Sequence, residues 1–395
     1  MTDWTTKVLH PDREPEPGFR SLVTPVYRGS TTLFPTAAAV GDDWRHEAGY
    51  TYGLRGTPTT RELAVRLAEL EHGLRTFITP GGQAALALIG MSFLSAGDHV
   101  LLPDSVYGPN RQFAEDVLAR FGVAVEFYPP MDGAGIEARI RPSTRLIWCE
   151  SPGSVTMEVQ DVPAIAAAAH RHGVVVALDN TYSAGVFFDA FAHGVDVTMQ
   201  ALTKYVGGHS DLLLGSVTVR SQEAYERVGV THDRLGLGAS PDDCALALRG
   251  LETLGVRLAA LERNTLQVAT WLAEQPAVAR VLHPALSSCP GHETWRRDFT
   301  GSTSVFSIVL AESTGREDVL AFVDALGLFR IGYSWGGVHS LAVPYGGVAR
   351  RYDTGYGHRL VRLNVGLEAP GDLISDLAQA LTAMRPQPRD RRREQ

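Results

Sequence analysis

A single lysine, Lys204, stands where an apolar run meets a glycine-rich turn. The run is Val197-Thr-Met-Gln-Ala-Leu-Thr-Lys204, and Tyr-Val-Gly-Gly-His-Ser-Asp211 follows it. A primary amine that is kept partly dry has a lowered pKa and forms a Schiff base with a carbonyl compound. A lysine at the end of a strand is more often a solvated surface charge. This stretch alone therefore leaves two interpretations open, a nucleophile or a surface cation.

Two acidic residues upstream end apolar runs in the same way. Asp179 closes Val174-Val-Val-Ala-Leu-Asp179, and Glu150 closes Leu146-Ile-Trp-Cys-Glu150. A carboxylate at the end of a buried strand requires a cation or several hydrogen-bond donors, because an unpaired buried charge is costly. Capping of a helix is the alternative role for Asp179.

A pair of glycines, Gly81 and Gly82, precedes a predicted helix in Phe77-Ile-Thr-Pro-Gly-Gly-Gln-Ala-Ala85. Free N–H groups and the partial positive charge of a helix N-terminus suit a phosphate, although a plain strand-to-helix turn also uses glycines. With Asp179 and Lys204, the turn gives an anion site, a carboxylate for a ring nitrogen and an amine for an aldehyde. Those are the three groups by which pyridoxal 5′-phosphate is held.

The elements that position these residues alternate regularly. We predict a short strand that begins at Phe77 and further strands over 99–102, 124–128, 146–150, 174–179 and 196–200. We predict helices over 59–72, 110–121 and 162–172, and a helix that follows the Gly81-Gly82 turn and ends at about residue 94. Gly73 is predicted to occupy the C-cap position of the first helix. Short apolar runs separated by helices indicate a mostly parallel sheet with helices on both faces, and such sheets bind ligands at the carboxyl ends of their strands.

The composition excludes several classes of protein. The chain has 395 residues, 44% of them hydrophobic and 20% charged, with a formal net charge of −8. The sequence has no dominant basic stripe, so we do not expect nucleic acid as a partner. The one strongly basic segment, 385–395, is expected to be a solvated tail. Cys149, Cys244 and Cys289 are odd in number and far apart, which argues against a disulfide framework. Without a signal peptide or a run of membrane-spanning length, we expect a cytoplasmic protein that does not bind membranes.

The length and the patterning predict three parts. We expect an extended N-terminal arm over 1–58, a large domain over 59–250 that holds the groups described above, and a small domain over 251–395. The small domain is predicted to contain helices over 251–274, 316–326 and 372–384 and strands over 279–283, 304–310 and 360–365.

The motifs as a set resemble the Cys/Met-metabolism family of pyridoxal-phosphate enzymes, which has the aspartate-aminotransferase fold, fold type I. Nearly the whole chain, from about Thr5 to Ala383, takes part in the resemblance. The motifs are Tyr52-Gly-Leu-Arg-Gly-Thr-Pro-Thr59, Glu150-Ser-Pro-Gly153, Asp179-Asn-Thr181, Ala201-Leu-Thr-Lys-Tyr205, Gly208-His-Ser-Asp211, Leu248-Arg-Gly-Leu-Glu-Thr-Leu254 and Tyr333-Ser-Trp-Gly-Gly337. Within the family the likeness is greatest to its cystathionine β-lyase branch.

The resemblance implies roles for particular residues. Lys204, Asp179 and Tyr107 would be catalytic: Lys204 would hold the cofactor and move protons, Asp179 would pair with the ring nitrogen, and Tyr107 would stack on the ring. The further cofactor ligands implied are Gly82, Gln83, Thr203, Tyr52 and Arg55. Arg362 would bind the substrate α-carboxylate, and Tyr333, Ser334 and Trp335 would complete the substrate site; no metal is implied.

The sequence departs from the family pattern at three positions. Relatives usually carry Arg where this chain has Leu54, often Ser where it has Ala201, and Glu where it has His339. Arg55 is a candidate for the missing charge at the phosphate. The resemblance also implies that Tyr52 reaches the phosphate of a neighbouring subunit, and hence a homodimer with shared sites, within a tetramer.

The implied reaction is β-elimination of L-cystathionine, or of a related S-substituted cysteine, to homocysteine or another thiol, pyruvate and ammonia. Tyr333, where γ-eliminating relatives typically carry Glu, favours β-elimination. The alternatives are a γ-eliminating or γ-replacing enzyme of the same family and a specialised C–S lyase of secondary metabolism.

Overall fold

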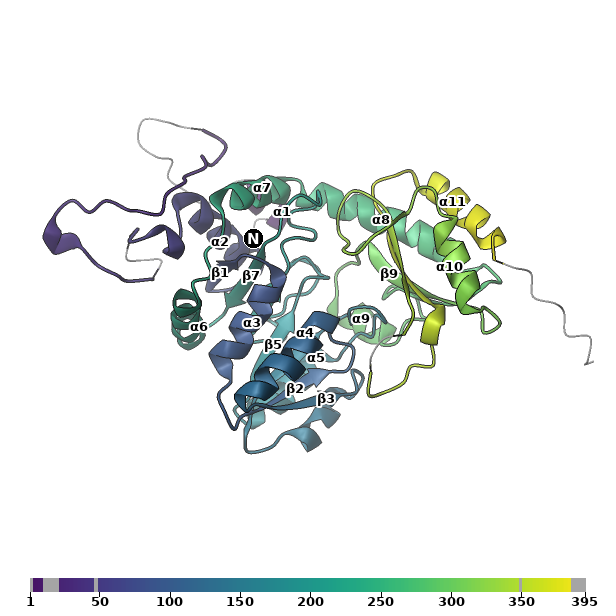
Figure 1. Cartoon of the computed structure of the whole chain (residues 1–395), viewed down its shortest axis with the longest axis horizontal. Coiled ribbons are helices and arrows are strands. Elements are labelled where there is room, and N and C mark those ends of the chain that lie inside the picture. The colour runs from purple at the N-terminus through teal and green to yellow at the C-terminus, as the bar shows by residue number, and fades with distance from the viewer. Residues whose placement is uncertain (1–2, 10–20, 46–48, 348–349, 385–395) are drawn as a thin grey trace, which may run out of the picture.

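The computed structural model describes residues 3–9, 21–45, 49–347 and 350–384. The predicted basic tail, 385–395, lies outside the described residues. The described part of the arm contains one short helix, α1 (Trp4–Leu9), and two single turns, η1 (Ala37–Ala39) and η3 (Gly53–Arg55). Figure 1 shows most of this purple segment extending away from the body of the protein.

The large domain is built on a seven-stranded sheet. Its strands are β1 (Arg75–Thr79), β2 (His99–Pro103), β3 (Ala124–Tyr128), β4 (Thr144–Glu150), β5 (Val175–Asp179), β6 (Val197–Gln200) and β7 (Gly215–Val219). The order is β1-β7-β6-β5-β4-β2-β3, and only β7 runs antiparallel to its neighbours, β1 and β6. The mostly parallel sheet was predicted. β7 was not predicted, because it is fully buried yet contains only two apolar residues.

Helices cover both faces of this sheet, which makes the predicted three-layer sandwich. The helices are α2 (Pro58–Leu70), α3 (Gly82–Phe93), α4 (Gly108–Phe113), α5 (Val162–Arg171), α6 (Gln222–Leu235) and α7 (Pro241–Glu252). α4 continues through the irregular turns η4 (Ala114–Leu118) and η5 (Ala119–Phe121), and η6 (Gly133–Arg139) follows β3. One core lies under α3, η4 and α6, and the other faces of the strands pack against α2, α5 and α7.

The end of α2 differs from the prediction for Gly73. His72, with φ of 56°, takes the left-handed position after the C-cap Glu71, and the N–H of Gly73 bonds to the carbonyl of Ala68 at 2.8 Å. The helix thus ends in a Schellman motif in which the left-handed position, usually a glycine, is His72, and Gly73 is the next residue. Glycine is required there by packing, because a Cβ at position 73 would stand 2.3 Å from Cγ2 of Thr218.

The small domain has a five-stranded sheet and its own core. The strands are β8 (Val278–Leu282), β9 (Val305–Leu310), β10 (Arg330–Ile331), β11 (Leu341–Tyr345) and β12 (Leu360–Asn364), in the order β10-β11-β12-β9-β8. The helices are α8 (Leu254–Ala273), α9 (His292–Asp298), α10 (Arg316–Asp324) and α11 (Pro370–Thr382), and the turn η7 (Gly357–Arg359) precedes β12. Leucine and valine side chains of α8, α10 and α11 pack on the sheet. The predicted domain boundaries near 58 and 250 remain predictions.

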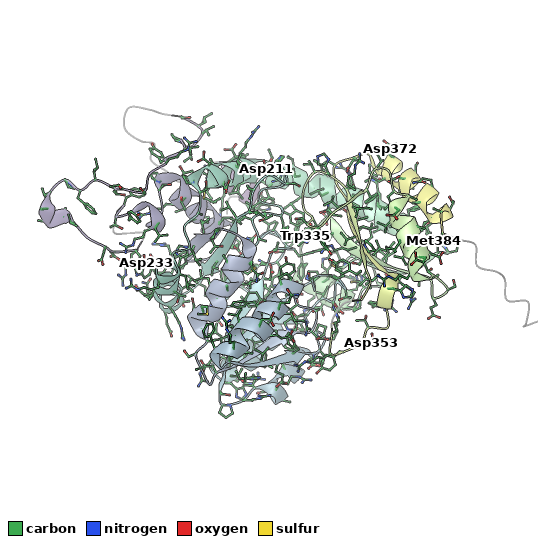
Figure 2. All side chains as sticks on the ribbon, viewed as in Figure 1. Asp211, Asp233, Trp335, Asp353, Asp372 and Met384 are labelled. Carbon is green, nitrogen blue, oxygen red and sulfur yellow. The ribbon has the colours of Figure 1, made fainter. Side chains whose placement is uncertain are left out.

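The two domains lie side by side, with α8 leading from one to the other (Figure 1). Trp335, labelled in Figure 2, lies at the junction and packs against apolar residues of both domains. Within the described residues, no helix is both long enough and apolar enough to cross a membrane.

Candidate active site

A cavity of about 350 Å³ lies at the carboxyl ends of β4, β5 and β6, the edge at which parallel sheets place their sites. Lys204, Asp179 and Glu150 are the charged residues among those described that line it. The wall also includes Gly81, Gly82, Gln83, Tyr107, Ala201, Thr203, Leu213 and Trp335. The structure therefore brings together the lysine, the aspartate and the glycine turn that the sequence analysis selected.

Lys204 follows β6, and its largely buried side chain lines this cavity. Burial, with a smaller effect from the nearby Arg362 cation, lowers the pKa of Lys204 to about 8. Nζ donates a hydrogen bond to Oγ of Ser334 at 2.8 Å and lies 5.3 Å from the ring centre of Trp335. An amine with this pKa is neutral in about a tenth of the molecules at pH 7, far more than an ordinary lysine, and the neutral form is the one that nucleophilic attack and proton abstraction require.

Asp179 and Glu150 end neighbouring strands and lie opposite each other in the register of β4 and β5. Burial raises the pKa of Asp179, while the hydrogen bonds from Thr181 and the charge of Lys204 oppose the shift. Burial and the nearby Asp179 hold the pKa of Glu150 well above its usual range. Of these two carboxyl groups, Asp179 is the one on which the charge of Lys204 acts.

Glu150 also fixes the position of Tyr107. Its Oε2 accepts the backbone N–H of Tyr107 at 2.7 Å, at the start of α4. Burial and the carboxyl groups of Asp179 and Glu150 raise the pKa of the Tyr107 phenol. Glu150 was absent from the predicted site residues, although its place at the end of a strand was a usable signal.

The N-terminus of α3 points its first N–H groups at the cavity. These groups have no partner within the helix, and no side chain caps them, since Gly81 is the N-cap residue. A Cβ on Gly82 would stand 2.8 Å from Cβ of Ala201, so only glycine lets the turn approach β6 this closely. The close approach leaves room and donors for an anion beside Gln83.

Thr203 and Ala201 form the opposite wall of this anion site. The Thr203 hydroxyl bonds to the backbone of Leu214, donating to its carbonyl at 3.1 Å. Ala201 presents a methyl group where a hydroxyl would add a further donor, and its N–H donates to Oγ1 of Thr181.

Arg362 lies on β12 and is 6% exposed. Burial lowers the pKa of its guanidinium, and the charged or titratable groups that act on it are the tyrosines Tyr345, Tyr107 and Tyr333. None of the described acidic residues forms an ion pair with it. A dry cation without a counterion is unfavourable unless a ligand supplies the negative charge. Arg362 is near enough to affect the pKa of both Lys204 and Tyr107.

The segment Tyr333 to Gly337 lies over Lys204. Ser334 adopts a left-handed conformation with φ of 82°, which a residue with a side chain keeps only when its surroundings hold it there. The ring centre of Trp335 lies 5.3 Å from that of Tyr205. Tyr333 is 79% exposed and lies outside the cavity lining, as does His339, whose side chain is exposed.

The predicted ligands on the arm lie away from the cavity of their own chain. Tyr52 is 49% exposed. Nε of Arg55 donates to Oδ1 of Asp233 at 2.8 Å, in an ion pair whose side chains are 17% and 7% exposed. Asp233 is labelled in Figure 2 beside the arm, far from Trp335. Leu54 packs near Gly238.

Residues 5–382 match the sequence profile of the family described as Cys/Met metabolism PLP-dependent enzyme. The chain belongs to this family. It is therefore a pyridoxal-phosphate-dependent enzyme of fold type I, as the resemblance of its motifs implied. The "Putative cystathionine beta-lyase" of Rhizobium johnstonii is 44% identical to it over 96% of each chain. The "Cystathionine beta-lyase" of Bordetella avium is 41% identical over 93% of each.

The fold is also that of a solved relative. The crystal structure of metB from Corynebacterium glutamicum matches this chain with a TM-score of 0.90 at 28% identity, over 97% of this chain and 99% of that one. The cavity fits the family's cofactor, because it combines the uncapped helix end at Gly82, the partly dry amine of Lys204 and the carboxylate of Asp179.

Proposed function

We propose that the protein is a carbon–sulfur lyase that carries out β-elimination on L-cystathionine or a related S-substituted cysteine. The products would be homocysteine or another thiol, pyruvate and ammonia. The observation that carries the proposal is that Lys204, whose pKa is lowered, lies near Arg362, a buried arginine with no acidic partner among the described residues. These two groups suit an amino-acid substrate, which brings a carboxylate and a Cα proton that the bound cofactor makes acidic.

The residues proposed to hold the cofactor surround the cavity. Asp179 would face its ring nitrogen, Lys204 its aldehyde carbon, Tyr107 its ring, and Gly82, Gln83 and Thr203 its phosphate. When bound, pyridoxal 5′-phosphate supplies an electron sink for negative charge at the substrate Cα. Tyr52 would add a contact from a second subunit. Arg55 remains a predicted phosphate ligand. To bind a phosphate, its guanidinium must first break its ion pair with Asp233.

Side chains of the protein would carry out substrate binding and proton transfer. Arg362 would bind the α-carboxylate with two parallel N–H bonds and so orient the Cα–H bond toward Lys204. The neutral amine of Lys204 would take the Cα proton, and the Cβ–S bond would break with the electron pair leaving on sulfur. The lysine, now protonated, would be placed to return the proton to that sulfur. Ser334 would hold the amine in line, while Trp335 and Tyr333 would border the sulfur substituent.

The proposal includes the assembly and the compartment. Large apolar side chains of the arm are exposed in the single chain, among them Leu22, Leu33 and Val40 at 101%, 89% and 65%. The exposure of such side chains supports a homodimer in which a second copy buries them. We propose that two such dimers form a tetramer. The three cysteines are free and buried, which fits a reducing, cytoplasmic location. The division at 58 and 250 is likewise proposed.

Analysis of the products formed from L-cystathionine tests the reaction. We expect pyruvate and homocysteine in equal amounts with ammonia. The appearance of 2-oxobutyrate and cysteine would instead assign γ-elimination. If cystathionine is not cleaved, S-alkyl and S-aryl cysteines should be, and failure of all of them to yield pyruvate would overturn the proposal.

A further inference from the structure

Asn364 lies two residues after Arg362 on β12, is 2% exposed, and has no role in the reaction described above. Its side-chain amide makes three hydrogen bonds. Oδ1 accepts from the N–H of Gly336 at 2.9 Å and from Oγ of Ser304 at 2.7 Å, and Nδ2 donates to the carbonyl of His339 at 2.9 Å. A backbone N–H can only donate and a carbonyl can only accept, so these partners determine which way the amide faces.

The orientation of this amide fixes the direction of a longer chain of hydrogen bonds. Since Ser304 gives its one hydroxyl proton to Asn364, the phenol of Tyr205 must donate to Ser304 Oγ, 2.9 Å away. The phenol oxygen accepts the N–H of Ser304 at 3.0 Å. Tyr205 directly follows Lys204, so the chain connects the lysine segment of the large domain to the small domain. Tyr205 and Ser304 are both fully buried, where a hydrogen bond is strong and its loss is costly.

Asn364 holds the segment that covers the lysine. A Cβ on Gly336 would stand 3.1 Å from the carbonyl carbon of Lys204, so the segment lies directly on the lysine backbone. On one side of Trp335, Ser334 accepts the hydrogen bond of the lysine amine in its left-handed conformation. On the other side, Gly336 and His339 are bound to Asn364. The backbone around Ser334 therefore depends on the amide of Asn364 for its position.

We propose that Asn364 is a positioning residue that holds the Ser334–His339 segment on Lys204 and thereby sets the reactivity of the lysine amine. The inference rests on the proposed role of Lys204 in catalysis. Aspartate cannot substitute, because its second oxygen would face the carbonyl of His339 and repel it. Alanine would leave the N–H of Gly336 and the hydroxyl of Ser304 without their shared acceptor.

Hydrogen exchange of the holoenzyme tests the structural part directly. We expect the peptide 333–340 to exchange faster than in the wild type in both variants: in Asn364→Ala the N–H of Gly336 loses its acceptor, and in Asn364→Asp the second carboxylate oxygen repels the carbonyl of His339. Leu377→Ala is the matched control: it removes a fully buried side chain from the small-domain core and touches none of these groups. It should lower Tm without selective exchange at 333–340. Equal protection of this peptide in wild type and Asn364→Ala would overturn the inference.

The lysine itself gives the second measurement. The visible absorption of the lysine-bound cofactor should titrate at a shifted pH in both Asn364 variants and at the wild-type pH in Leu377→Ala. We also expect kcat/KM to fall about tenfold, which corresponds to ~1.4 kcal/mol of transition-state stabilisation. An unshifted titration in the Asn364 variants, or the same shift in Leu377→Ala, would show that the amide does not act through the lysine.

Tyr205→Phe keeps the inference testable if Asn364→Ala fails to fold, because it removes one hydroxyl and leaves the ring beside Trp335. Its effect on the titration should be smaller than that of Asn364→Asp, and the two changes combined should be less than additive, since they break one chain. Additive effects would contradict the chain. Product analysis and Lys204→Ala together separate the two proposals: failure to form pyruvate defeats the proposed function, whereas a visible band lost in Lys204→Ala, with wild-type behaviour of the Asn364 variants, defeats only the positioning role.

Discussion

Two arginines predicted to bind anions lie in opposite environments. Arg362, on β12 of the small domain, is buried among tyrosines without an acidic partner in the described chain. Arg55, at the base of the arm, is held by Asp233 in a largely buried ion pair. Both side chains are cations removed from much of the solvent. They differ in whether the protein already supplies the negative charge.

This difference separates a binding group from a structural one. A buried charge that has its counterion contributes to the folded state, because removal of either partner leaves the other charge buried and unpaired. A buried charge without a counterion costs stability, and its retention indicates that a ligand completes the pair. We therefore expect Arg362 to hold its charge for a ligand and the base of the arm to use charge for packing.

The largest effect is expected at Lys204, the lysine whose pKa Arg362 helps to lower. Lys204→Ala should lose turnover by several orders of magnitude, because it removes the group proposed to form the covalent bond and to move the Cα proton. Steady-state assays would measure the loss, and circular dichroism should show an unchanged fold. Retention of near wild-type turnover would mean that another lysine does the work.

Arg362→Met should lower kcat/KM about 100-fold, as expected when charged hydrogen bonds of ~1.5–3 kcal/mol to a carboxylate are removed. Most of the change should appear in KM. The same variant should leave Tm unchanged or raise it, because an uncompensated buried cation is replaced by an apolar side chain. Arg362→Lys is the control, because lysine retains the charge but cannot bind a carboxylate through two parallel N–H bonds. A marked fall in Tm for Arg362→Met would contradict the unpaired state of the arginine.

The pH dependence of cofactor attachment probes the lysine amine. Below its pKa of about 8 the amine is mostly protonated, so the attachment rate to the apoenzyme should rise about tenfold per pH unit and level off above that pH. Stopped-flow absorbance measures this rate. Because Arg362 helps to lower the pKa of Lys204, Arg362→Met should move the plateau to higher pH. Arg55→Met should leave it in place, and a plateau unaffected by Arg362→Met would mean that burial alone sets the lysine pKa.

Arg55→Met should act mainly on stability. It leaves the largely buried carboxylate of Asp233 with the exposed Arg234, 3.3 Å from Oδ2, as its remaining cation, which should lower the free energy of unfolding by up to about 3 kcal/mol. Urea denaturation would measure the change, with Arg28→Met as a control, since the ion pair of Arg28 with Asp242 is exposed. Weaker cofactor binding with undiminished stability would assign Arg55 to the phosphate instead.

The smallest effect is expected from adding a charge next to this pair. Leu54→Arg should tighten cofactor retention about fivefold, the size expected for a partly exposed charge interaction of ~1 kcal/mol. Dialysis against a carbonyl reagent, followed by measurement of bound cofactor, would report it. Unchanged retention would mean that Arg55 already supplies the charge in the assembled enzyme.

Local sequence pattern was sufficient to predict the fold class and the large-domain half of the cavity. Asp179 ends a predicted strand, and Lys204 and the Gly81-Gly82 turn follow predicted strands within a few residues; parallel strands bring their carboxyl ends to one edge of a sheet. Their placement therefore follows from local pattern plus one general rule. The family resemblance then supplied the chemistry that this arrangement serves. Glu150 obeyed the same rule and was recognisable for the same reason.

The partners of the remaining residues depend on how the elements pack in three dimensions. The pairing of Arg55 with Asp233 joins positions 178 residues apart, and the hydrogen bond between Asn364 and Gly336 joins β12 to the segment over the lysine. No periodicity encodes such contacts, because they arise where separately formed elements meet. The same holds for β7, whose five residues are identified as a strand only by the two neighbours that bury them. Charge and hydrogen-bonding capacity are properties of the residue, but whether a partner satisfies them is a property of the fold.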